Sequence, residues 1–176
     1  MSKLVLTVVG DDRAGLVQSL AHVVSEHGGN WETSELAELA GAFAGIVLVS
    51  VPDARLAELN GALQNLDGLL RVTVHGSGAQ DADRQVVARP GRRFAFSVLG
   101  NDRPGIVRDV TGILTRHGIT IDLFSSETRD APMAGGTLFE ATVTARVPDE
   151  TDVAQAIADL EQLAGEIQVD LSLLEG

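Results

Sequence analysis

The order of apolar and polar residues in the first 30 positions predicts a strand followed by a helix. Leu4, Leu6 and Val8 alternate with Val5 and Thr7, which is the period of a strand. Because both faces of this strand are apolar, we expect it to lie in the centre of a sheet. The next apolar residues have the spacing of one helical face: Leu16, Val17, Leu20, Val23 and Val24.

The same pattern returns ninety residues later. Residues 4–31 align with residues 94–121 without a gap, and eight of the 28 positions are identical. A short phrase separates the strand from the helix in both copies, as GDDRAGLV in the first and GNDRPGIV in the second. A single repeat of this length indicates a duplicated domain.

Further alternating and helical runs complete each copy. A second and a third strand are predicted over 30–39 and 44–51 in the first copy, and over 120–129 and 137–147 in the second. A second helix follows Pro52 or Pro148, with apolar residues at helical spacing. The last strand is expected over 69–76 in one copy and 167–174 in the other.

This order predicts an α+β fold made of two ferredoxin-like βαββαβ domains, each with an antiparallel sheet and its helices on one face. The domains are expected over 1–76 and 94–176. The polar, glycine- and proline-containing stretch 77–93 is predicted to be a linker, in which QVVA could add a short edge strand.

Several residues are predicted to begin or end the helices. Gly28 and Gly118 stand where a left-handed residue ends a helix. Asp53 and Asp149 are expected at the N-caps of the second helices. His27 and His117 end equivalent first helices, where an imidazole favours the helix dipole, and we prefer this role to metal binding.

Composition narrows the possible functions. The chain has no cysteine, which excludes disulfides and thiolate chemistry, and no apolar run is long enough for a membrane span. The net charge of −12 disfavours direct nucleic-acid binding. The start of the chain reads as a strand and not as a signal peptide, so the cytoplasm is the default expectation. No motif of a nucleophile elbow, phosphate loop, dinucleotide site or zinc site is present, so we expect neither an enzyme nor a metal or other cofactor.

The repeated phrase has the residues of a carboxylate-binding turn. Asp12 and Asp102 could accept hydrogen bonds from amides at the helix start, and Pro104 suits the first helical turn. Gly15 and Gly105 leave no side chain over the helix N-terminus, so a ligand carboxylate could reach its free amides. A well-capped strand–helix turn without a ligand is the alternative interpretation.

The phrase resembles the DRPG turn of ACT domains, which are regulatory modules of the ferredoxin-like fold that bind amino acids between paired domains. The chain is also similar to the glycine cleavage system repressor family, through its two bare ACT-like units and the stretch APMAGGTLF (131–139). That resemblance implies a ligand-responsive regulator that works through a partner protein, with glycine or serine as first ligand candidates and a homo-oligomer as the expected assembly.

The resemblance to ACT domains also implies a set of ligand-binding residues. They come from the turn after the first strand and from the start of the second strand: Asp12, Ala14, Gly15, Leu16 and Asn30 in the first copy, and Asp102, Pro104, Gly105, Ile106 and Asp122 in the second. Because Thr120 stands where the first copy has Asn30, one site is expected to be stronger, or only one to exist.

Two other functions remain open from the sequence. ACT-like units precede catalytic domains in some enzymes of amino-acid and one-carbon metabolism, so the chain could be a regulatory subunit of such an enzyme. Small βαββαβ units also pair through their sheet edges, so a purely structural dimerisation module is the other alternative.

Overall fold

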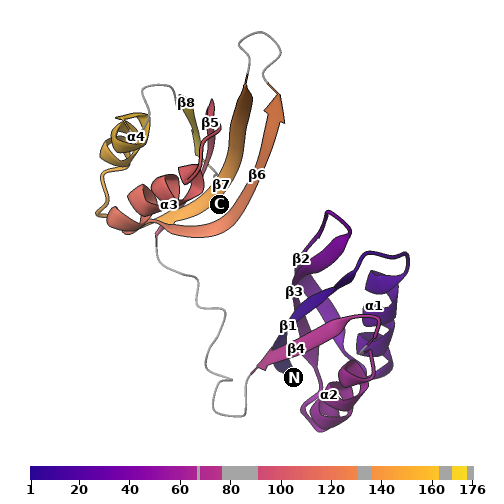
Figure 1. Ribbon diagram of the computed structural model, residues 1–176. Helices are drawn as coiled ribbons and strands as arrows, with labels where there is room; N and C mark the ends of the chain where they lie inside the picture. Colours follow the sequence, from indigo (N-terminus) through magenta and orange to yellow (C-terminus); the bar gives the residue numbers. More distant parts are fainter. Residues whose placement is uncertain (67, 77–90, 131–135, 163–167, 174–176) are drawn as a thin grey trace. The chain divides into compact units, whose positions relative to one another are not determined.

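The computed structural model describes residues 1–66, 68–76, 91–130, 136–162 and 168–173. The chain divides into two compact units, Met1–Val87 and Ala88–Gly176 (Figure 1). Most of the predicted linker 77–93 lies outside the described residues, together with QVVA, but its last two residues already belong to the first strand of unit 2.

Unit 1 is a four-stranded antiparallel sheet with two α-helices. Its strands lie in the order β2-β3-β1-β4, so β1 is an inner strand, as its two apolar faces predict. The elements are β1 (Ser2–Asp11), α1 (Leu16–Glu26), β2 (Asn30–Leu39), β3 (Ala42–Val51), the 3₁₀ turn η1 (Asp53–Arg55), α2 (Leu56–Gln64) and β4 (Arg71–Gly76).

Unit 2 repeats this topology. Its strands lie in the order β6-β7-β5-β8, with α3 and α4 together on one face of the sheet (Figure 1). The elements are β5 (Arg92–Asn101), α3 (Ile106–Arg116), β6 (Thr120–Asp130), β7 (Thr137–Val147), α4 (Val153–Gln162) and β8 (Gln168–Leu173). Both units therefore confirm the predicted βαββαβ fold.

Each unit has its own hydrophobic core between sheet and helices. In unit 1 the alternate residues Leu4, Leu6 and Val8 of β1 are buried, and their side chains meet the buried residues of α1 and α2. Leu6 and Leu59 are fully buried at the centre of this core. Burying a side chain of this size contributes about 1.5–3 kcal/mol, so the alternating pattern of β1 is sufficient to fix which face the helices cover.

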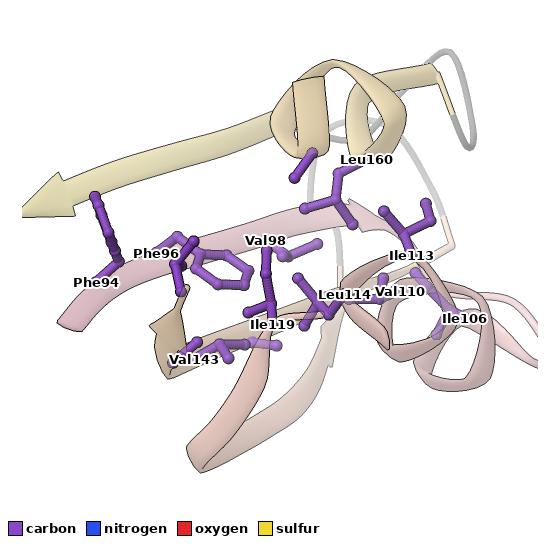
Figure 2. Packing of buried hydrophobic residues seen from close by; sticks show 14 of the residues in the cluster. Phe94, Phe96, Val98, Ile106, Val110, Ile113, Leu114, Ile119, Val143 and Leu160 are labelled. Carbon is purple, nitrogen blue, oxygen red and sulfur yellow. The ribbon is translucent and has the colours of Figure 1, made fainter. Parts of the chain in front are cut away.

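The core of unit 2 follows the same plan with different residues. Phe96, Val98, Ile113 and Leu160 lie together between the sheet and the two helices (Figure 2). Ala156 and Leu160 are the buried residues of α4, where α2 of unit 1 buries two leucines. The alanine leaves space beside it, and a cavity of about 20 Å³ lies there among apolar side chains.

The glycine helix ends are confirmed. Gly28 and Gly118 both have φ of +68°, the left-handed value, directly after the C-cap residues of α1 and α3. The amide of the residue after each glycine bonds back to a helix carbonyl: Gly29 to Val24 at 2.9 Å, and Ile119 to Leu114 at 2.9 Å. A side chain would strain this conformation, which explains the repeated glycine.

The predicted N-caps Asp53 and Asp149 are wrong. Asp53 accepts a hydrogen bond from the Ser2 hydroxyl at 2.5 Å instead, and Asp149 lies 3.8 Å from Arg92. In α4 the cap is Asp152, whose carboxylate accepts from the amides of Ala154 and Gln155. In unit 1 Asp53 is the first residue of the 3₁₀ turn η1, and Arg55 is the N-cap residue of α2. Unit 2 has one residue more between its proline and the helix, and Asp152 directly precedes α4.

Candidate functional site

The turn between β1 and α1 places a glycine at the helix start. Gly15 is the N-cap residue of α1, with φ of +93° and ψ of −1°. A Cβ built on Gly15 would meet no atom within 4 Å, so the space above this residue is open. The turn itself is held by the amide of Asp12, which donates to the carbonyl of Gly41 in the β2–β3 hairpin at 2.8 Å.

The first amides of α1 are available to a ligand. The amide of Ser19 donates to the carbonyl of Gly15 at 2.8 Å, whereas the amides of Leu16 and Val17 find no acceptor among the described residues. Such amides carry the positive end of the helix dipole and attract carboxylates. The Leu16 side chain is 3% exposed and belongs to the core, so only its backbone could contact a ligand.

Asp12 and Asp102 do not cap the helices. In the described part of the chain, no side chain makes an N-cap hydrogen bond to α1 or α3, and a left-handed glycine occupies the N-cap position in both. The amides of both aspartates are instead used by the β-hairpins, since Asp102 donates to the carbonyl of Thr137 at 2.8 Å. The side chains of Asp12 and Asp102 are exposed to solvent.

The second turn has the same left-handed glycine, but the residues before it form a different hydrogen bond. The sequence predicts Pro104 in the first turn of the helix, but it lies before α3. The amide of Ile106 donates to the carbonyl of Arg103 at 3.2 Å, and Gly105 has φ of +86° and ψ of 2°. These are the features of a type II turn, which favours proline and glycine at its two central positions. Ile106 is buried, like Leu16.

An ion cluster distinguishes the second turn. The Arg103 guanidinium donates to Asp109 at 2.8 Å, and Arg108 donates to the same carboxylate at 2.9 and 3.0 Å. These hydrogen bonds, first from Arg103 and then from Arg108, hold the pKa of Asp109 below its ordinary value. The Arg108 guanidinium also lies over Gly105, 3.1 Å from where a Cβ would be.

The first turn lacks this cluster. Gln18 and Ser19 stand where unit 2 has Arg108 and Asp109. The remaining arginine, Arg13, is half-exposed and lies 3.5 Å from the carboxylate of Asp11, which is itself 90% exposed. An ion pair with so exposed a carboxylate contributes little free energy, so Arg13 could bind the carboxylate of a ligand in place of Asp11.

The predicted second-strand residues lie far from the turns of their own units. Asn30 pairs with Ser50, which pairs with Lys3 near the start of β1, while the Gly15 turn follows the end of β1. Eight strand residues separate these levels of the sheet, roughly 26 Å at 3.3 Å per residue. Asn30 and Gly15 of one unit therefore cannot contact the same small ligand.

Asp122 lies at the corresponding end of unit 2, at a β-bulge near the start of β6. Arg146 donates to its carboxylate at 3.2 Å, and Arg93 lies 3.8 Å away. Glu32 is the matching bulge residue in unit 1 and accepts from Lys3 at 2.8 Å. The hydrogen bond from Lys3 keeps the pKa of Glu32 below its ordinary value. These paired carboxylates fasten a bulged strand to its sheet, so Asp122 has a structural partner at a position where the resemblance implies a ligand contact.

The two histidines end their helices differently. Nδ1 of His27 lies 2.7 Å from the carbonyl of Val23, within α1, which confirms the predicted contact with the helix end. His117 instead meets Asp159 of α4 at 2.8 Å, and this hydrogen bond lowers the pKa of the aspartate. Within the described residues, no three His, Asp or Glu side chains are grouped so that they could hold a metal ion.

Arg13, Arg103, Arg108 and Asp109 lie at the two turns but are not among the residues predicted from the sequence. Arg13 is identical in both copies of the phrase, and that identity was a usable signal. The Arg103–Asp109 contact had no such signal, because its partners are six positions apart and meet only through the bend between turn and helix.

Comparison with known proteins identifies the modules. Models of the ACT domain match residues 2–76 and 95–165. The chain belongs to the ACT-domain family. It consists of two ACT domains in tandem, one in each unit, and the Gly15 and Gly105 turns are therefore equivalent turns of two ACT domains.

Similarity to known proteins extends over both domains of the chain. The glycine cleavage system transcriptional repressors of Escherichia coli K12 and Shigella flexneri are each 26% identical over 178 residues, covering 97% of this chain and 88% of theirs. An unknown protein from Galdieria sulphuraria shares 29% identity, with a TM-score of 0.76 and 99% coverage of both chains. A solved candidate glycine cleavage system transcriptional repressor, 19% identical, has the same fold with a TM-score of 0.70, covering 99% of this chain and 98% of its own. This protein is thus a regulatory ACT-domain protein related to those repressors at low identity.

None of the described helices is long and apolar enough to span a membrane.

Proposed function

We propose that this tandem ACT-domain protein is a non-catalytic regulator that responds to a free amino acid and transmits the response to a protein partner. The observation that carries the proposal is the open space above Gly15, over helix amides without an acceptor among the described residues. A site of this kind suits a carboxylate, because the amides donate hydrogen bonds and the helix dipole favours negative charge. Arg13, two residues before Gly15 in the same turn, adds a half-exposed cation to this end of the unit.

The relatives indicate which amino acids to test first. The matched proteins from E. coli and Shigella are named as repressors of the glycine cleavage system. Glycine and serine are therefore the first candidates here, and control of transcription is the first candidate role. The net charge of −12 repels a phosphate backbone, so the proposed action on transcription goes through a protein and not through direct contact with DNA.

A melting-temperature screen with each of the twenty amino acids tests the proposal. A ligand that binds only the folded state stabilises it by about 2.7 kcal/mol at 100 times its Kd. For a unit of this size, that corresponds to a rise of several degrees. Glycine or serine is expected to give the rise, and the absence of a rise with all twenty would contradict the proposal.

Affinity capture tests the second half of the proposal. The full chain, immobilised at physiological salt, is expected to retain a protein from a lysate treated with nuclease, in an amount that changes when the stabilising amino acid is added. Tight binding of the pure chain to promoter DNA at the same salt would contradict action through a protein.

One observation favours the dimerisation module as a second candidate. β2 and β6 are sheet-edge strands of 10 and 11 residues, and most of their side chains are exposed. Long, exposed edge strands are surfaces on which another strand can pair. A chain that forms a defined oligomer but shows no rise in melting temperature with any amino acid would favour this role.

A further inference from the structure

The two turns have the same backbone but different side chains at two helix positions. Gly15 and Gly105 both have left-handed dihedral angles at the N-cap of an 11-residue helix. The third and fourth residues after each glycine are Gln18 and Ser19 in unit 1, but Arg108 and Asp109 in unit 2. These two positions give the first helical turn of unit 2 an arginine and an aspartate where unit 1 has two uncharged residues.

In unit 2 a carboxylate of the protein already satisfies the cations at the turn. Arg103 and Arg108 both donate to Asp109, at 2.8 to 3.0 Å. The Arg103–Asp109 pair is only partly exposed to water, with side chains that are 38% and 21% exposed. Charge-assisted hydrogen bonds of this kind are stronger than neutral ones.

A free ligand would have to compete with this internal carboxylate. Asp109 is tethered to its arginines, so its effective concentration is far above that of a dissolved metabolite. Its negative charge also lies within the first turns of α3, where it compensates the dipole that would attract the ligand. The Arg108 guanidinium, bound to Asp109, covers Gly105 as well.

In unit 1 nothing equivalent is present among the described residues. Ser19 carries no charge, and no atom lies within 4 Å of where a Cβ on Gly15 would be. Arg13 pairs at 3.5 Å with the exposed Asp11, its one ion-pair partner in the described part of the chain. We propose that Asp109 is a built-in carboxylate that blocks the second turn, so that each chain takes one amino acid, at the Gly15 turn. This inference rests on the proposed function and assigns it to one of the two ACT domains.

Two single substitutions exchange the deciding residue between the units. Asp109→Ser gives unit 2 the residue of unit 1, and Ser19→Asp does the reverse. The readout is the amide signals of Gly15 and Gly105 in two-dimensional NMR spectra of the full chain, during titration with glycine and, separately, with serine. Asp149→Ser is the matched control, because it removes the same charge from unit 2 at an exposed residue outside the turn.

The wild-type chain is expected to shift the Gly15 signal and leave Gly105 unchanged, at one ligand per chain. Asp109→Ser should add a saturable shift at Gly105, Ser19→Asp should weaken binding at Gly15 at least tenfold, and Asp149→Ser should match the wild type. Equal shifts at both glycines in the wild type would overturn this inference and leave the proposed function standing. The inference would also be overturned if the Gly105 amide signal did not shift in Asp109→Ser while the Gly15 signal still did. No shift at either glycine with glycine, serine or any of the other eighteen amino acids would overturn the proposed function and this inference with it.

Discussion

Asn30 and Gly15 lie at opposite ends of the sheet of unit 1. Asn30 is level with Lys3 at the start of β1, and Gly15 follows the strand's last residue, Asp11. Family resemblance places both residues at one ligand, but roughly 26 Å of strand separates their levels. If one ligand contacts both residues, we predict that it lies between the Gly15 turn of one chain and Asn30 of a second copy of the chain.

Mixing two inactive variants tests this arrangement. Gly15→Val and Asn30→Ala should each lose amino-acid binding in a homo-oligomer. In a mixed dimer, one site combines the intact Gly15 of one chain with the intact Asn30 of the other, so about a quarter of the binding capacity should return on random pairing. Calorimetric titration of the mixture measures this capacity. Capacity that stays at zero in a mixture shown to exchange subunits would contradict a shared site.

Gly15→Val should abolish the ligand response without unfolding the protein. The valine side chain would occupy the open space over the helix amides, where nothing lies within 4 Å now. A non-glycine residue at φ of +93° also costs about 1–2 kcal/mol. Gly136→Val is the matched control, because Gly136 has φ of +96° and equally open space in the other unit. The melting temperature of each variant with and without ligand separates strain from blocked binding, and a response that survives in Gly15→Val would place the site elsewhere.

The ion cluster at the second turn predicts a loss of stability in acid. Hydrogen bonds from Arg103 and then Arg108 hold the pKa of Asp109 below its ordinary value. A carboxylate whose pKa is lower in the folded than in the unfolded chain stabilises the fold above its unfolded pKa of about 3.9. This contribution disappears as the pH falls through the folded pKa.

Asp109→Asn should therefore melt below the wild type at pH 6, and the difference should shrink toward pH 2. Asp149→Asn, which alters a carboxylate 3.8 Å from Arg92, should show a smaller difference at pH 6. Melting curves of the three proteins across this range measure the effect. A difference between Asp109→Asn and the wild type that stays constant from pH 6 to pH 2 would contradict the assignment to this carboxylate.

Removal of a core leucine should destabilise unit 1. Leu59 is fully buried, so Leu59→Ala should lower the free energy of unfolding by about 2–5 kcal/mol. Leu39→Ala, at a side chain that is 79% exposed, should change it by about 0.5 kcal/mol or less. Trp31 is the only tryptophan and packs against this core, so its fluorescence during urea denaturation reports on unit 1. Equal midpoints for the two variants would contradict the described core.

The fold could be predicted from the sequence because the patterns that indicate each element are local. The alternation in β1 and the helical spacing after Gly15 each lie within one element, and Gly28 and Gly118 mark helix ends by a conformational need that glycine meets best. The repeat then supplied the same result twice.

The candidate site was harder to predict because it depends on the pairing register of the strands and on the bends between elements. The sequence does not show that Asn30 pairs at the level of Lys3, since a pairing register is set by two strands together. The prediction that Asp12 caps the helix is wrong for a similar reason. The amide of Asp12 bonds to Gly41 of the β2–β3 hairpin, which is distant in sequence, and Gly15 is the N-cap residue of α1.

Calorimetric titration of the full chain with glycine or serine, and with the methyl ester of the same amino acid, measures carboxylate recognition directly. The free amino acid should bind saturably at one molecule per chain, and the ester, which lacks the negative charge that the Gly15 amides and Arg13 attract, should bind at least tenfold more weakly. Equal affinity for acid and ester would contradict a carboxylate site at the Gly15 turn.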